Sequence, residues 1–137
     1  MLFRSPRLSI TIDYSDYKCV KACIHNQGLG PALLKSITYV SEDKKIEIKS
    51  EQDYFDLFKS IGIDKLASYL DANIFGDGSP LKEGCEKLLF SLELKEEHDV
   101  DKQHERSQLL INIFSKLSYK FVYSDLYNNI DSISDTM

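Results

Sequence analysis

Alternating apolar and polar side chains mark short strands in the first 50 residues. Leu8, Ile10 and Ile12, for example, are separated by polar residues, a pattern typical of a strand with one buried face. The expected strands cover Arg7–Asp13, Lys18–Asn26, Leu33–Val40 and a segment around Ile46 and Ile48, with turns at Tyr14–Asp16 and Ser41–Lys44.

The spacing of apolar residues becomes helical after residue 50. Ser50 is followed three positions later by Asp53, the arrangement that caps a helix N-terminus, and Gly62 is placed to end the helix. The apolar face between them consists of Tyr54, Leu57, Phe58 and Ile61. A second helical piece is expected from Asp64, with Leu66, Ala67 and Leu70 on one face, followed by a short strand over Asn73–Phe75.

The second half of the chain predicts a strand, an amphipathic helix and a closing strand. Glu86–Leu94 alternates strongly, with Leu88, Phe90, Leu92 and Leu94 on one face. After a polar segment, Glu96–Gln103, the apolar spacing over Arg106–Leu117 is that of a helix. Tyr119, Phe121 and Tyr123 indicate the closing strand. Residues 76–84 are expected to form an exposed loop.

Together these elements predict a mainly β fold, an antiparallel Ig-like β-sandwich of about seven strands. Its helices are inserted in two connections, Lys49–Phe75 and Glu96–Ser118. Parallel sheets show continuous apolar runs instead of this alternation. A chain of 137 residues fits one domain. We therefore assign residues 1–128 to a single sandwich domain and residues 129–137 to a flexible polar tail.

Charge limits the classes of partner. The chain has 17 basic and 22 acidic side chains, a net charge of −5, and a pI near 5.2. Residues 71–137 carry 7 basic and 13 acidic side chains, so this half is acidic. Without a basic stripe, binding to nucleic acid through phosphate contacts is not expected.

The cysteines and the short apolar runs indicate in which cellular compartment the protein is expected. Cys19, Cys23 and Cys85 are an odd number, and Cys19 and Cys23 would lie about 13 Å apart in a strand, too far for a disulfide. Reduced thiols favour the cytoplasmic side of a membrane. Apolar runs of only a few residues predict neither a transmembrane span nor a signal peptide in this sequence.

The stretch from Asn26 to Ala32 has the glycine pattern of a tight loop. A dinucleotide-binding fingerprint needs a third glycine and a following helix, whereas position 33 is Leu and a strand is expected next. We therefore interpret Asn26, Gly28, Gly30 and Pro31 as a structural loop. Gly28 or Gly30 is expected to have a positive φ, and Asn26 to bond the backbone of its own turn.

Cys19, Lys21, Cys23 and His25 share one face of the second expected strand. A structural zinc site needs four ligands, and no second Cys/His pair is present. An activated thiol needs a helix N-terminus or a cationic environment, which a strand centre does not offer. We therefore predict no catalytic residue, no metal and no cofactor, and interpret these four residues as an interaction face.

Three stretches of the chain are distinctive in their order: NQGLGPALLKSITYV (Asn26–Val40), LKEGCEKLLFSLEL (Leu81–Leu94) and YKFVYSDLYNN (Tyr119–Asn129). They resemble a loose group of uncharacterised bacterial proteins in which a short N-terminal membrane helix precedes a β-sandwich carrying an N-x-G-x-G-P-A motif. The group also shares a G-E-x-x-x-L segment and a late Y-x-S-x-Y-G-E. In this chain Cys85 stands between Gly84 and Glu86, and Asn128-Asn129 replace Gly-Glu. The resemblance implies a fold and a membrane tether preceding Met1, but no reaction.

These observations predict a non-enzymatic interaction or sensory domain that binds another protein, or itself, through its sheet surface. The alternation of Lys and Glu over Lys45–Lys49 is typical of a guarded sheet edge. The alternative is a small-molecule-binding or hydrolytic domain, with a site among Gly76–Gly84, the helical insertions and the Cys23/His25 face. An uncovered sheet edge or an exposed apolar patch would favour the first hypothesis, and a cleft with convergent polar groups the second.

Overall fold

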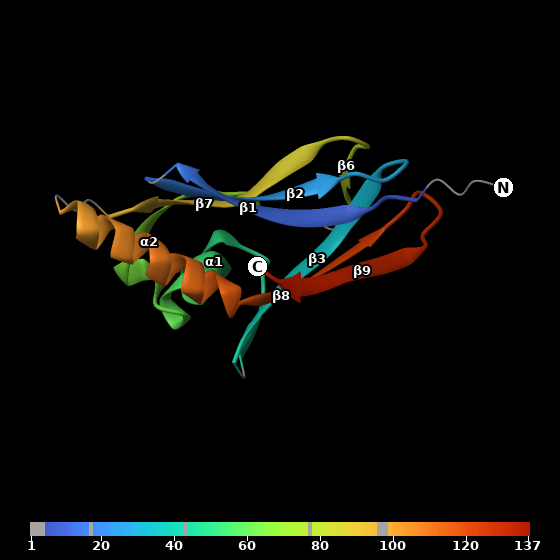
Figure 1. The fold of residues 1–137 in the computed structure, drawn as a ribbon. Coiled ribbons are helices and arrows are strands. Elements are labelled where there is room, and N and C mark those ends of the chain that lie inside the picture. The colour runs from blue at the N-terminus through green and yellow to red at the C-terminus, as the bar shows by residue number, and fades with distance from the viewer. Residues whose placement is uncertain (1–4, 17, 43, 77, 96–98) are drawn as a thin grey trace.

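The computed structural model describes residues 5–16, 18–42, 44–76, 78–95 and 99–137. Within these ranges the chain forms nine strands, two α-helices and one 3-10 helix (Figure 1). In chain order they are β1 (Leu8–Asp16), β2 (Cys19–Asn26), β3 (Ala32–Ser41), β4 (Lys44–Glu47), α1 (Glu51–Ser60), the 3-10 helix (Ile63–Lys65), β5 (Ala67–Ala72), β6 (Ser79–Leu81), β7 (Glu86–Leu94), α2 (Val100–Ser115), β8 (Ser118–Ser124) and β9 (Ile130–Thr136).

The strands form two antiparallel sheets that pack face to face (Figure 1). Over the described ranges, the first sheet has the order β1-β2-β7-β5 and the second the order β4-β3-β8-β9, with β6 paired to the start of β3. Helix α1 connects β4 to β5, and α2 connects β7 to β8. The prediction of an antiparallel, mainly β fold with helices in two connections is confirmed. The described strands outnumber the seven that we expected.

The core lies between the two sheets and is closed by aromatic rings from the helices. On β2, Val20, Ala22 and Ile24 are buried, and the residues between them are at least partly exposed. Around Phe90 of β7, the ring centroids of Tyr54, Phe58 and Phe114 lie 5.6, 5.1 and 5.8 Å away. Because these rings come from α1 and α2, both helical insertions are part of the core.

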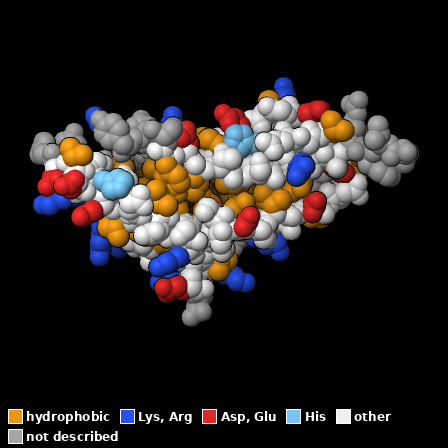
Figure 2. Space-filling view, in the orientation of Figure 1, with side chains coloured by type: hydrophobic (Ala, Val, Ile, Leu, Met, Phe, Trp, Pro, Cys, Tyr) orange, Lys and Arg blue, Asp and Glu red, His pale blue; other side chains and the backbone are white. Residues whose placement is uncertain are grey.

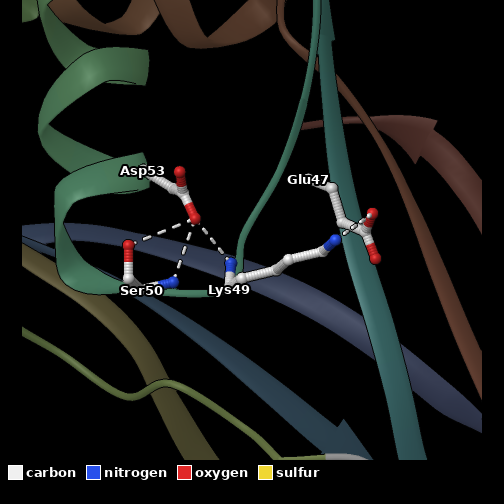
Figure 3. Close-up of polar contacts among 4 residues, drawn as sticks. All are labelled: Glu47, Lys49, Ser50 and Asp53. Atoms are coloured by element: carbon white, nitrogen blue, oxygen red, sulfur yellow. Dashed lines mark hydrogen bonds and ion pairs between the residues drawn. The ribbon is translucent and has the colours of Figure 1, made fainter.

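Helix α1 begins with the capping box that the sequence predicts (Figure 3). Asp53 Oδ2 accepts hydrogen bonds from the backbone N–H groups of Lys49 (2.8 Å) and Ser50 (3.0 Å), and these bonds lower the pKa of the Asp53 carboxyl. Lys49 Nζ also lies 3.7 Å from Glu47 Oε2 of β4 (Figure 3). Gly62 follows the helix with a φ of 82°. The capped helix contacts both β4 and β5.

The segment after α1 differs from the prediction. The helical piece expected from Asp64 is only the 3-10 turn, and Ala67–Ala72 is strand β5, paired with β7. Over so few residues the apolar positions fit a helix or a strand, and the unpaired edge of β7 decides between them. The strand expected over Asn73–Phe75 is irregular chain. There Asn73 bonds to β7 through its backbone N–H (to the Leu89 carbonyl, 3.1 Å) and its side chain (to the Leu88 carbonyl, 2.8 Å).

Two segments interpreted as loop or tail contain strands. In place of a polar tail over residues 129–137, β9 pairs with β8 along its whole length. Within residues 76–84, β6 pairs with β3 and buries Leu81 completely. Both strands are short or polar, so their sequences carry little alternation, and pairing with an existing strand supplies their stability.

Smaller differences concern element boundaries. The turn expected at Tyr14–Asp16 is instead the irregular end of β1, where the register with β2 shifts between Asp13 and Asp16. Helix α2 begins at Val100 rather than Arg106, because Asp99 Oδ1 caps it by accepting the N–H of Asp101 (2.9 Å). The parts of our predictions that fall on residues 1–4, 43, 77 and 96–98 lie outside the described residues.

Candidate functional site

The side chain of Asn26, at the end of β2, is 1% exposed and uses its hydrogen-bonding capacity in full. Its Oδ1 accepts the backbone N–H groups of Arg7 (3.2 Å) and Gly28 (3.1 Å). Its Nδ2 donates to the carbonyl oxygens of Gly30 (2.9 Å) and Leu81 (3.0 Å). Because a side-chain amide has two N–H donors and an oxygen with two lone pairs, these bonds leave nothing for a ligand.

The two glycines of this loop meet different requirements. A Cβ on Gly28 would lie 2.2 Å from the backbone nitrogen of Arg7 and 2.5 Å from the carbonyl oxygen of Ser5, so no side chain fits there. Gly30 has a φ of 81°, a conformation that glycine adopts without strain. The expectation of a positive φ at one of these glycines is confirmed. The contacts of the Asn26 loop serve to join backbone segments, which is a structural role.

The expected interaction face lies on the outer side of the first sheet. Lys21 is exposed, and Cys19, Cys23 and His25 are partly exposed. Directly paired with them on β1 and β7 are mostly polar or charged residues, among them Asp13, Thr11, Glu93, Ser91 and Glu86. The face is therefore polar, and it offers a partner few apolar contacts.

A row of three polar side chains crosses this face. The sequence analysis did not predict this row. Thr11 Oγ1 lies 2.7 Å from His25 Nε2, and His25 Nδ1 lies 3.1 Å from Glu86 Oε2. When Nδ1–H donates to the carboxylate, Nε2 accepts the hydroxyl proton, which is the order of groups in a nucleophile–base–acid triad. The register of three strands creates this row, so no spacing within the sequence could have revealed it.

The surroundings of the row favour a structural role. Acyl transfer needs N–H donors that converge on the developing oxyanion, whereas β2, which carries His25, pairs with β1 and β7 and bonds its N–H groups to these strands. The side chains of His25 and Glu86 are 25% and 63% exposed, so water reaches the row freely. We interpret the row as a cross-strand ladder that joins β1, β2 and β7.

The thiol chemistry of this face is weak. Burial, and next the charge of Glu86, raise the pKa of Cys23, so its thiol stays protonated at neutral pH. All three cysteines of the chain are free. Across the described ranges, no group of three or more His, Cys, Asp or Glu side chains is placed to hold a metal ion.

A shallow groove of about 320 Å³ lies where the C-terminal ends of α1 and α2 approach the turn between β3 and β4. Ile61 and Ile113 provide apolar lining, and Lys44 and Lys116 provide charged lining. Residues 78–84, which contain β6, lie at the other end of the molecule (Figure 1). The loop and the helical insertions, which our alternative hypothesis joined in one site, are therefore far apart.

The two long sides of the sandwich, where the edge strands lie, are covered by the helices to different extents. Helix α1 contacts both β4 and β5, the edge strands on one side, and closes that side. The remaining edge strands, β1 and β9, lie on the opposite side, which faces the viewer in Figure 1. Figure 2 shows hydrophobic side chains exposed between them. We call this surface the apolar strip; it consists of Ile10, Ile12 and Tyr14 of β1 and Ile133 of β9, all partly exposed and packed on the core. Helix α2 borders the strip at Tyr14, whose ring centroid lies 6.5 Å from that of Phe114.

Comparison with known proteins adds no assignment: no family model, curated protein or solved structure matches the chain significantly. Neither of the described helices is long and apolar enough to cross a membrane.

Proposed function

We propose that this protein is a non-enzymatic interaction domain that binds an extended protein segment through the edge of β1. The observation that carries the proposal is the open side of the sandwich, where an edge strand borders the apolar strip. Exposed strand edges are templates for pairing with a further strand, and proteins use them to bind extended segments.

The backbone of β1 has its hydrogen-bonding groups oriented for such pairing. The N–H of Gln27 donates to the carbonyl of Arg7 (2.8 Å), and these two residues continue the register in which Leu8 pairs with Asn26. Because bonded and non-bonded pairs alternate in an antiparallel ladder, the N–H and C=O groups of Ile10 and Ile12 point away from β2. They therefore face the open edge.

On the other edge strand of this side, side chains of the strand occupy two of the outward-pointing N–H groups. The N–H of Met137 donates to the Leu117 carbonyl (2.8 Å), so by the same alternation the N–H groups of Ser132 and Thr136 point outward. Asp131 Oδ1 and Asp135 Oδ1 accept these N–H groups, each at 2.8 Å. A strand added on this side would thus pair with β1 rather than with β9.

We also propose that the sandwich is Ig-like. The orders β1-β2-β7-β5 and β4-β3-β8-β9 support this assignment, because they match an Ig arrangement with strands A-B-E-D in one sheet and C′-C-F-G in the other. In that correspondence α1 lies between C′ and D, α2 lies between E and F, and β6 is an addition.

A site-specific cross-linking experiment tests the proposed function. A photoreactive residue replaces Ser9 of β1 in the full chain, expressed in its native host, and the matched control carries it at the exposed Lys59 of α1, on the closed side. We expect one discrete adduct from position 9 and none from position 59. The variant Ile10→Pro should abolish the adduct, because proline removes an N–H that points to the open edge and leaves the bonds between β1 and β2 in place.

Circular dichroism and thermal melting establish whether the Ile10→Pro variant is folded. If it is not, Ile12→Pro takes its place in the experiment. An adduct with another protein, or with a second copy of the chain, supports the proposed function. Equal labelling from both positions, or an adduct that persists in the folded proline variant, contradicts it.

A further inference from the structure

We infer that the partner segment carries the pattern basic-x-apolar-x-basic, with its inward-facing side chains resting on β9; this inference rests on the proposed function. A strand added to β1 has alternate side chains directed to the same face as Ile10 and Ile12. That face looks across the apolar strip toward the second sheet, so the residues of β9 that face inward decide which side chains fit.

Three residues of β9 face inward. Asp131, Ile133 and Asp135 pair directly with Tyr123, Phe121 and Tyr119 of β8, whose side chains are all buried in the core. Directly paired residues share a face of the sheet, so the two carboxylates and the isoleucine between them lie on the core side.

Contacts of the two aspartates agree with this placement. The hydroxyl of Tyr123 donates to Asp131 Oδ2 (3.3 Å). Burial and then the neighbouring carboxylate, Asp131 for Tyr123 and Asp135 for Tyr119, raise the pKa of both tyrosines. Asp131 and Asp135 are nevertheless exposed on the open side, and Figure 2 shows acidic side chains along the lower border of the exposed hydrophobic surface.

The spacing of these residues sets the pattern of the partner. Positions 131, 133 and 135 are alternate residues of one strand, so the carboxylates are separated by about 13 Å along it. The inward-facing residues of an added strand have the same repeat. A basic residue, an apolar residue and a basic residue at positions i, i+2 and i+4 would therefore lie opposite Asp131, Ile133 and Asp135.

A second copy of the chain fits this surface less well. Pairing β1 with β1 of another copy by a two-fold axis would bring the two β9 edges toward each other. The four carboxylates of Asp131 and Asp135 would then approach, and like charges oppose such an arrangement. The net charge of −5 acts in the same direction. A basic segment of a different protein has neither disadvantage.

A peptide titration tests the inference. The probe is a fluorescent seven-residue peptide, Thr-Lys-Thr-Val-Thr-Lys-Thr, added to the full chain while fluorescence anisotropy is measured. A matched peptide has glutamate in place of both lysines. Another has N-methyl groups on the amides of the two lysines and the valine, the N–H groups that face β1 in an antiparallel pairing. We expect the lysine peptide to bind at least about tenfold more tightly than the glutamate peptide. The N-methylated peptide should not bind, because it cannot donate to β1.

Protein variants locate the site. Asp131→Asn and Asp135→Asn retain an oxygen for the N–H groups of Ser132 and Thr136 but lose the charge. Each should weaken binding of the lysine peptide about three- to tenfold. The control Glu93→Gln, on the outer face of the first sheet, should leave the affinity unchanged. Thermal melting confirms that all three variants are folded.

The outcomes separate the inference from the function on which it rests. Absence of binding, equal affinity for the lysine and glutamate peptides, or insensitivity to both aspartate substitutions overturns the inference. If ultracentrifugation shows a dimer that Ile10→Pro dissociates, the occupant is a second copy, so the inference fails while the proposed function stands. If no peptide binds and position 9 yields no cross-linked adduct, both fail.

Discussion

Asn26 shows how one side chain can organise three segments of a β-sandwich. Its amide joins Arg7 before β1, the loop before β3, and Leu81 of β6. A buried amide left without partners costs about 1–3 kcal/mol, so the loop holds only while all of these segments are in place. The loop is therefore a structural joint at one end of the molecule.

Alanine substitutions at the glycines test this joint. Gly28→Ala should lower the free energy of unfolding by about 2 kcal/mol or more, because its Cβ would collide with backbone atoms that cannot move freely. Gly30→Ala should lower it by about 1–2 kcal/mol through its positive φ. The control is Gly76→Ala, where a Cβ would meet only Ser79 Oγ at 3.9 Å. There, stability should be unchanged or raised by up to about 1 kcal/mol. Urea denaturation measures all three, and equal effects at the three positions would contradict this account.

At the scale of the element, β7 departs from the alternation that identified it. Its register with β2 shifts between the pairs Ala22–Phe90 and Cys23–Leu88, so Leu89 is the extra residue of a β-bulge. Leu89 is completely buried, while Leu88 is partly exposed. The strand thus changes its inward face at this point, which simple alternation from Leu88 to Leu94 does not anticipate.

The bulge makes a prediction opposite to that of the sequence pattern. Leu89→Ala should lower the free energy of unfolding by about 3 kcal/mol, the usual cost of a cavity at a buried leucine. Leu88→Ala, its neighbour and matched control, should cost less than about 1 kcal/mol because that side chain is partly solvated. Chemical denaturation of the two variants is the measurement. A larger loss for Leu88→Ala would mean that β7 has no bulge.

For the whole molecule, the helices make the sandwich asymmetric. Helix α1 covers the side of β4 and β5 and inserts Tyr54 into the core, where its hydroxyl lies 3.2 Å from that of Tyr39. Among the described residues, helix α2 covers the opposite side at one end (Figure 1), where the ring centroids of Phe114 and Tyr14 of β1 lie 6.5 Å apart. One side is thus fixed by a buried aromatic cluster, while on the other the residues of the apolar strip are partly exposed.

The buried tyrosine pair predicts a loss of stability at alkaline pH. Burial raises the pKa of Tyr39 and Tyr54 above the value of about 10 that they have in the unfolded chain. The unfolded state therefore loses protons first, and the contribution of the pair is constant below about pH 10 and falls as the pH rises further. We expect these two tyrosines to ionise only when the domain unfolds, as measured by tyrosinate absorbance and circular dichroism together.

The double variant Tyr39→Phe/Tyr54→Phe is the matched control for this effect. Removing both hydroxyls leaves no unpaired polar group, so stability at neutral pH should change little. The decline above about pH 10 should become shallower. Ionisation of the pair in the folded protein near the ordinary pKa of tyrosine would contradict the prediction.

The sequence by itself determined the elements whose stability is mostly local. The alternation in β2, β3 and β8, the capping box at Ser50 and the glycine loop after Asn26 were all readable, because each records burial or backbone geometry within a few residues. Tertiary structure alone decided the strand β9, the bulge at Leu89, the Thr11–His25–Glu86 row and the side left open beside β1. Each of these depends on which strand pairs with which neighbour and in which register, and pairing between residues distant in the chain leaves little trace in local hydrophobic periodicity.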